Sequence, residues 1–293
     1  MELRPLGSTG LSVPAVALGA GHVGDPSKSD ADVERLLDRA LELGVTLVDT
    51  ARSYGLSEER IGRWIGARRP RVLLSTKVGY GIAGHEDWTP GCIAAGIDEA
   101  LARLRVDAID LVHLHSCPTH VLERPGVVDA LVRAKDAGKV RVAAYSGEGE
   151  PLRWAIESGA FGAVQCSVSL FDQANEAHVL PLALARGVGV LAKRPLANAP
   201  WRFAERPAAE DVAAYWDRLR AMALPKPNGG WAPFALRYVL HAPGVSAVLV
   251  GTGTAAHLSD AVLAAGEGPL SPNTVATARA AFARLPDAQR TIV

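Results

Sequence analysis

The 293-residue chain carries 31 basic and 31 acidic side chains, so its formal net charge is zero. This balance provides no overall positive field that would attract nucleic acid or an anionic membrane. Hydrophobic residues make up 48% and charged residues 21%, which excludes a disordered chain and is typical of a globular protein.

Short apolar runs alternate along the chain with segments of helical period. Such continuous runs are expected where a parallel sheet is buried on both faces. The predicted strands are 16–21, 47–51, 73–77, 110–115, 140–146, 163–168, 188–193 and 246–251. The predicted helices include 32–43, 58–65, 90–104, 127–137, 209–221 and 271–285. Ser57 is expected to cap the second of these helices, and Gly44 and Gly138 are expected to end helices.

Eight strands alternating with helices fit a closed (β/α)8 TIM barrel, although an open doubly wound sheet would give a similar count. Residues 6–13 are expected to form a short N-terminal hairpin across the barrel bottom. Residues 197–231 form a long insertion rich in Pro and Trp, which is a candidate substrate loop or lid. No linker is visible, so residues 1–293 are expected to form a single domain.

Polar residues stand where the predicted strands end, and in a barrel all these ends open on one face. Tyr54 lies five residues beyond Asp49, on the loop above the second strand. The polar residues at or near the strand ends are Asp49, Lys77, His115, Ser146 and Gln165.

The chemistry that these residues suggest is proton donation to a carbonyl oxygen. Free tyrosine has a pKa of about 10, and an ammonium beside the phenol is expected to lower the pKa of Tyr54. Asp49 would fix Lys77 and balance its charge, while His115 would orient the substrate oxygen. None of these side chains is a convincing nucleophile, so the reducing equivalent must come from a cofactor.

The segment 45–55, which reads VTLVDTARSYG, resembles the signature of the aldo-keto reductase family. The segments 75–77 (STK) and 110–115 (DLVHLH) resemble those that carry this family's catalytic Lys and His, and 138–141 (GKVR) followed by Ser146 is similar to its fifth strand. The likeness extends from Leu3 to about Val262. It implies an NAD(P)-dependent oxidoreductase that interconverts aldehydes or ketones and alcohols, with a tetrad of Asp49, Tyr54, Lys77 and His115.

By this resemblance, Ser146 and Gln165 hydrogen-bond the carboxamide of a nicotinamide dinucleotide. The loop Gly251, Thr252, Gly253 and Thr254 meets its phosphate and adenosine end, where a helix start suits an anion.

The sequence also departs from the family pattern. Gly147 stands where the family usually has Asn. Lys193, Arg194 and Leu196 stand where the family has an aromatic that stacks on nicotinamide. All three are expected to contact the cofactor, the two cations at its pyrophosphate. His257 stands at the position of an Arg that some members use for the 2′-phosphate, so either NADPH or NADH is expected.

Two other functions stay open. His113 and His115 point to the same side of a strand, as a metal pair in a barrel hydrolase would. The neighbouring strand ends supply Lys77, Ser146 and Lys193, which are poor metal ligands. The other alternative is a barrel that binds the cofactor without catalysis.

A dinucleotide fingerprint is matched by 251–256 (GTGTAA), but no βαβ unit follows it. Four aromatic residues lie on loops after the third and seventh strands and are candidates for the substrate pocket. They are Tyr80, Trp88, Trp201 and Phe203.

The three cysteines, Cys92, Cys117 and Cys166, are odd in number and irregularly spaced, which favours a reducing compartment. The start of the chain lacks a signal-peptide pattern, and no stretch approaches the roughly 20 apolar residues of a spanning helix. A cytoplasmic protein with a small carbonyl or alcohol substrate is therefore expected, without a nucleic-acid or membrane partner. Its oligomeric state is left open.

Overall fold

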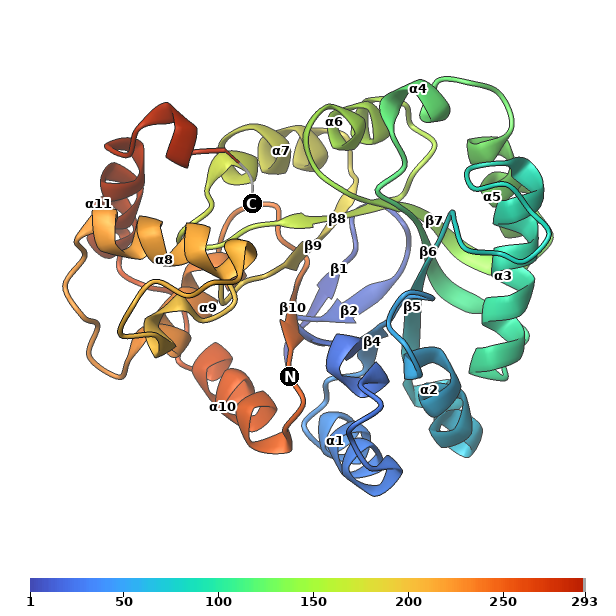
Figure 1. Cartoon of the computed structure of the whole chain (residues 1–293), viewed down its shortest axis with the longest axis horizontal. Helices are drawn as coiled ribbons and strands as arrows, with labels where there is room; N and C mark the ends of the chain where they lie inside the picture. The colour runs from blue at the N-terminus through green and yellow to red at the C-terminus, as the bar shows by residue number, and fades with distance from the viewer. Residues whose placement is uncertain (292–293) are drawn as a thin grey trace.

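The computed structural model describes residues 1–291 and shows a closed barrel of eight parallel strands in the order β10-β3-β4-β5-β6-β7-β8-β9 (Figure 1). The predicted barrel is confirmed and the open-sheet alternative is wrong, because β10 pairs with β3 and closes the ring. The barrel strands are β3 (Val16–Gly19), β4 (Leu47–Asp49), β5 (Leu73–Val78), β6 (Ile109–His115), β7 (Val140–Ser146), β8 (Ala163–Ser167), β9 (Gly189–Lys193) and β10 (Ala247–Gly251).

Helices surround the barrel, and those predicted from the sequence are present with ends shifted by a few residues (Figure 1). The α-helices are α1 (Asp30–Glu42), α2 (Ser57–Ile65), α3 (Pro90–Leu104), α4 (Thr119–Leu122), α5 (Val127–Asp136), α6 (Gly149–Glu157), α7 (Ala174–Ala185), α8 (Glu210–Met222), α9 (Trp231–Leu240), α10 (Ala255–Gly266) and α11 (Pro272–Ala283). The short 3-10 helices are η1 (Ala20–Gly24), η2 (Gly66–Arg71), η3 (Pro200–Arg202) and η4 (Asp287–Gln289). Within residues 1–291, no helix has the length and apolar character to cross a membrane.

The predicted hairpin is present as β1 (Leu3–Pro5) paired antiparallel with β2 (Ser12–Pro14). Its turn lies at the start of β9, where the backbone N–H of Ser8 donates to the Gly187 carbonyl at 2.7 Å. Leu6 and Leu11 from this turn pack with barrel-interior side chains from several strands. The hairpin therefore closes the amino-terminal end of the barrel and leaves the other end for the βα loops.

Helix ends follow their local chemistry, with one exception to the prediction. Gly44 and Gly138 both have φ +77° directly after a helix, as predicted for glycines that end helices. Ser57 does not cap α2. It is the first residue of the helix, and its buried hydroxyl instead donates to the Ala20 carbonyl and accepts from the Thr50 hydroxyl.

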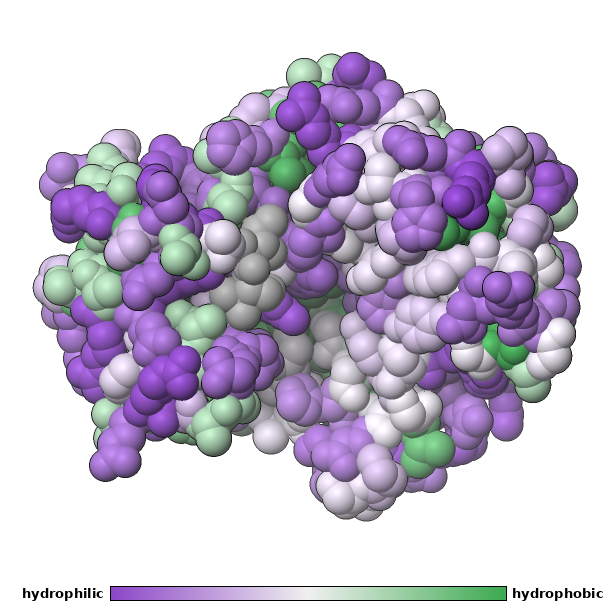
Figure 2. Space-filling view, turned by 45° about the horizontal axis from the view of Figure 1, so that its top comes forward, coloured by the Kyte–Doolittle hydropathy of each residue, from purple (hydrophilic) through white to green (hydrophobic). Residues whose placement is uncertain are grey.

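The insertion 197–231 contains η3 and, as α8, the helix predicted at 209–221. Helix α8 packs against η3 and α11, on the outside of the barrel (Figure 1). Figure 2 shows hydrophilic and hydrophobic side chains interspersed over the face in view, without a broad hydrophobic surface.

Candidate active site

The ends of β4 and β5 bring Asp49 and Lys77 together. The Lys77 ammonium lies 2.6 Å from Asp49 Oδ2 and also donates to the Thr50 carbonyl at 2.8 Å. Both side chains are buried, with 1% and 4% of their surface exposed. Burial alone would raise the pKa of Asp49, but the Lys77 charge, together with His113 and the hydrogen bonds from Lys77 and Ser75, holds the net pKa below its usual value. The sequence spacing thus produces a buried ion pair.

A chain of hydrogen bonds from His113 through Ser75 holds the Asp49 carboxylate in place. Ser75 donates to Asp49 Oδ1 at 2.7 Å, and His113 Nε2 lies 3.0 Å from the Ser75 hydroxyl oxygen. Burial lowers the pKa of His113 to about 4, so its ring is neutral near pH 7. His113 is therefore an interior residue that contributes to the placement of the carboxylate.

Tyr54 lies above this ion pair, with the Lys77 nitrogen 4.9 Å from the centre of its ring. The loop that carries Tyr54 is fixed by a close approach to Gly24. The Gly24 carbonyl accepts from the Leu56 N–H at 3.1 Å, and a Cβ on Gly24 would stand 1.5 Å from the Tyr54 carbonyl oxygen. Only glycine at position 24 permits this placement of Tyr54.

The expected lowering of the Tyr54 pKa is wrong in its net direction. Burial raises the pKa of Tyr54 above its ordinary value, and the charge of Asp49 adds to this effect. Lys77 lowers the pKa, as predicted, but does not overcome the loss of solvation of the phenolate. Tyr54 is therefore a protonated phenol near neutrality, with an ammonium in place to stabilise its anion.

His115 completes the cluster from the end of β6. Its ring lies 6.4 Å from that of Tyr54, centre to centre, at 87°. The Tyr80 hydroxyl oxygen lies 2.7 Å from His115 Nδ1. Burial lowers the pKa of His115 to about 4, and the charges of Lys77 and Lys193 act in the same direction. The four side chains predicted from strand ends thus meet at one end of the barrel.

A model of the Aldo/keto reductase family matches residues 15–282. The chain belongs to the aldo/keto reductase family. It is accordingly an NAD(P)-dependent oxidoreductase of carbonyl compounds and alcohols, as the resemblance in the sequence implied.

This reductase has similar relatives among named proteins and solved structures. It is 29% identical to L-galactose dehydrogenase of Arabidopsis thaliana over 91% of this chain and 89% of the relative. A putative aldo-keto reductase structure from Pseudomonas aeruginosa matches with TM-score 0.74 and 28% identity, over 90% of this chain and 94% of the other. The holo form of aldo-keto reductase AKR11C1 from Bacillus halodurans shares the fold, with TM-score 0.83 and 24% identity, over 99% and 100% of the two chains.

Ser146 and Gln165 lie together at the ends of β7 and β8. The Ser146 hydroxyl donates to Gln165 Oε1 at 2.9 Å, and the buried Gln165 Nε2 has no hydrogen-bond partner within the described part of the chain. A buried donor without a partner is costly unless a ligand accepts its hydrogen. The carbonyl oxygen of a nicotinamide carboxamide is such an acceptor, so these two residues fit the cofactor of this family.

Lys193 has a carboxylate partner at the rim of the reductase. Its ammonium lies 3.1 Å from Glu148 Oε1. Glu148 is itself held by the Ser167 N–H at 2.8 Å and the Asn175 amide at 2.7 Å. This pair bridges the β7 loop and β9. The neighbouring Arg194 has φ +56° and interacts with the buried Tyr215. Both cations therefore have partners in the protein, which the sequence did not indicate.

The glycine-rich loop leads from β10 into α10. Thr254 caps α10 by accepting from the His257 N–H at 3.4 Å, while His257 itself is exposed. Lys28, from the loop before α1, donates to the Gly253 carbonyl at 3.4 Å. Lys28 was not predicted from the sequence, because 225 residues separate it from its partner along the chain. A cation beside a helix start fits the phosphate end of a dinucleotide.

The four aromatic residues proposed for the substrate pocket fall into two groups. Tyr80 and Trp88 lie in contact beside His115, with ring centres 5.9 Å apart. Trp201 instead packs against Phe171 at 6.4 Å, and Phe203 is 36% exposed. Trp201 therefore anchors its loop, whereas Tyr80 contacts His115 and Trp88 packs on Tyr80.

The proposed metal-ligand histidines and the three cysteines have surroundings that suit structural residues. His113 and His115 each direct one ring nitrogen at a protein hydroxyl group, and no group of three or more candidate metal ligands occurs within residues 1–291. The three cysteines are free and buried, and burial raises the pKa of Cys117 to about 12. A thiol with that pKa is unreactive near neutrality.

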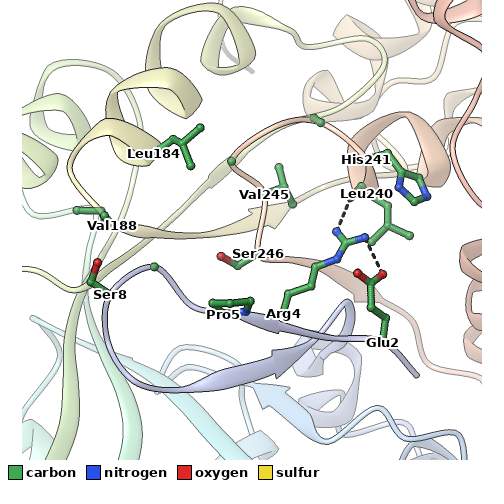
Figure 3. A pocket seen from close by; sticks show the side chains of 14 residues that line it. Glu2, Arg4, Pro5, Ser8, Leu184, Val188, Leu240, His241, Val245 and Ser246 are labelled. Atoms are coloured by element: carbon green, nitrogen blue, oxygen red, sulfur yellow. Dashed lines mark hydrogen bonds and ion pairs between the residues drawn. The ribbon is translucent and has the colours of Figure 1, made fainter.

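A cavity of about 570 Å³ lies at the opposite, amino-terminal end of the barrel (Figure 3). It is lined by the hairpin and by the segments before β9 and β10. Its cation, Arg4, already donates to the Leu240 carbonyl at 2.6 Å and to Glu2 at 2.9 Å (Figure 3). None of Asp49, Tyr54, Lys77 and His115 lines this cavity.

Proposed function

We propose that Tyr54 is the proton donor in carbonyl reduction by this enzyme, with Asp49, Lys77 and His115 completing the catalytic group. The observation that supports this most is the placement of the Lys77 ammonium, held by Asp49 at 2.6 Å and lying 4.9 Å from the Tyr54 ring. An ammonium in this position stabilises the phenolate that remains after the proton has left.

A reduced nicotinamide dinucleotide, when bound, supplies a hydride to the carbonyl carbon. As the electrons of the C=O double bond move to the oxygen, Tyr54 gives its proton to that oxygen. His115 donates a hydrogen bond to the same oxygen and holds it in line with Tyr54. Lys77 balances the charge of the phenolate, and Asp49 keeps Lys77 in place. In the reverse direction, the Tyr54 phenolate accepts a proton from an alcohol or sugar hemiacetal.

The cofactor is proposed to lie with its carboxamide at Ser146 and Gln165 and its phosphate end near 251–254 and Lys28. The dinucleotide is also proposed to contact Lys193, Arg194, Leu196 and His257. Lys193 would do so while paired with Glu148. Three free, buried cysteines are compatible with a reducing compartment, and we propose a cytoplasmic location.

The variant Tyr54→Phe tests the assignment. Removing the hydroxyl is expected to lower kcat for nitrobenzaldehyde reduction by a factor of about 100 or more, the usual contribution of a general acid. Cofactor affinity, measured by quenching of tryptophan fluorescence with NADPH and with NADH, is expected to stay within about twofold, as for a group acting on the transition state alone. Unchanged turnover in this variant would reject Tyr54 as the proton donor.

The native enzyme supplies the second half of the test. If the protein binds a cofactor but single-turnover measurements with several aldehydes and alcohols show no hydride transfer, the barrel is a binding protein without catalysis.

A further inference from the structure

Tyr80 contacts His115, the one member of the proposed catalytic group whose neutral side chain can carry its hydrogen on either of two nitrogens. Its hydroxyl oxygen lies 2.7 Å from His115 Nδ1, and the two rings are nearly parallel, at 25°, with centres 5.6 Å apart. A second polar atom, the Ser53 hydroxyl oxygen, lies 3.4 Å from the Tyr80 oxygen, which is a long hydrogen bond.

The distances indicate the direction of the hydrogen bond. A phenol has one hydrogen to donate, and an unprotonated imidazole nitrogen is a much better acceptor than a serine hydroxyl at 3.4 Å. If Tyr80 donates to Nδ1, that nitrogen carries no hydrogen. In a neutral ring the hydrogen then resides on Nε2.

We propose that Tyr80 is a positioning residue that holds His115 in the neutral form with its hydrogen on Nε2. Because Nδ1 is occupied by the Tyr80 hydroxyl, Nε2 is the nitrogen left to donate to a substrate carbonyl oxygen. The inference rests on the proposed role of His115 in orienting that oxygen.

The loop after β5 holds Tyr80 in place. The Trp88 ring packs on Tyr80 at 66°, and the backbone N–H of Trp88 donates to the Gly79 carbonyl at 2.8 Å. Gly79 has φ +144°, and a Cβ there would stand 2.1 Å from the Trp88 ring. Glycine is therefore required beside Tyr80, since any larger residue would displace the indole that fixes the phenol.

The charges around His115 also oppose protonation of its ring. Lys77 and Lys193 disfavour an imidazolium, and Asp49 favours it, while His113 is neutral near pH 7. Tyr54 and Tyr80, whose rings contact that of His115, are phenols. Removing the Tyr80 hydroxyl would free the lone pair of Nδ1, so the pH at which His115 becomes protonated is expected to rise.

The tautomer is tested directly by two-dimensional ¹H–¹⁵N NMR of full-length protein labelled with ¹⁵N-histidine, with His115→Gln used to assign the ring signals. Protonated and unprotonated ring nitrogens have well separated shifts. At pH 7 the wild-type protein is expected to show hydrogen on Nε2 and none on Nδ1. Hydrogen on Nδ1 in the wild-type protein would overturn the proposal. This measurement needs no turnover, so its outcome is independent of the proton-donor role of Tyr54.

Two variants separate the possible partners of Tyr80. In Tyr80→Phe the His115 signals are expected to move toward a mixture of tautomers, whereas Ser53→Ala is expected to leave them unchanged. His115 signals that stay unchanged in Tyr80→Phe would show that the Tyr80 hydroxyl does not set the tautomer, and would overturn the proposal.

Kinetics give a further readout. Tyr80→Phe is expected to lower kcat by up to about tenfold, the factor that corresponds to one net hydrogen bond. The acid limb of its pH profile is expected to move to higher pH, and cofactor affinity is expected to stay unchanged. A pH profile identical to that of the wild-type enzyme, together with an unchanged tautomer, would show that Tyr80 only packs against His115.

Discussion

At the scale of single residues, the buried pair of Asp49 and Lys77 has two roles. It holds the Lys77 ammonium beside Tyr54, where it can stabilise the phenolate, and it buries two ions away from water. A buried charge that loses its partner is costly, whereas a pair removed as a whole is often tolerated. The stability of the chain should therefore depend on the balance of the pair more than on either member.

A double-mutant cycle measures this balance. Lys77→Met leaves the Asp49 carboxylate unpaired and is expected to lower the free energy of unfolding by about 3–5 kcal/mol. Adding Asp49→Asn removes the stranded charge and is expected to restore a large part of that loss. Urea denaturation at pH 7 measures all four proteins. Additive losses in the double variant would show that the two side chains are not energetically coupled.

At the scale of elements, the site depends on close contacts at the backbones of two loops. The Tyr54 loop contacts η1 at Gly24, and the Tyr80 loop folds back so that the Trp88 ring packs against Gly79. The sequence placed Tyr54 and Tyr80 on loops near strand ends but did not show these contacts. The contact at Gly24 joins two separate segments, and the contact between Gly79 and Trp88 depends on how a loop without regular secondary structure folds back.

The variant Gly24→Ala tests the first of these contacts. The added Cβ would meet the Tyr54 carbonyl, so the loop must move, and a displacement of about 1 Å at a catalytic group can cost about 100-fold in rate. We expect kcat for nitrobenzaldehyde to fall by about that factor. Gly21→Ala is the matched control in the same 3-10 helix, since no atom lies within 4 Å of its added Cβ. Equal activity in the two variants would contradict a steric role for Gly24.

At the scale of the whole molecule, the two ends of the barrel differ in what lies inside them. The hairpin packs on apolar interior side chains at the amino-terminal end, while Asp49, Tyr54, Lys77 and His115 gather at the other end. Keeping these groups in an interior has a consequence for pH. His113 and His115 have pKa values of about 4 in the folded protein, against about 6.5 in an unfolded chain.

Below pH 6.5 the unfolded chain takes up protons that the folded chain does not, so the free energy of unfolding is expected to fall from pH 6.5 toward pH 4. For the fully buried His113 alone, the loss at pH 5 is about 2 kcal/mol. Urea denaturation at pH 7 and pH 5 measures the change. His113→Gln does not titrate, and its change between the two pH values should be smaller by about that amount. Equal changes in both proteins would show that His113 is not held neutral.

What the sequence by itself determined was the alternation of eight strands with helices and the place of Asp49, Lys77 and His115 at strand ends, with Tyr54 on a loop above one of them. These features follow from local patterns. The pairing of β10 with β3 closed the ring, and a closed ring of parallel strands brings all their carboxyl ends to one face. The tertiary structure alone decided the net direction of the Tyr54 pKa, since burial depends on everything packed around the phenol. It also decided which partners serve His115 and Lys193, because hydrogen bonds and ion pairs between distant loops leave no periodic signal in a single chain.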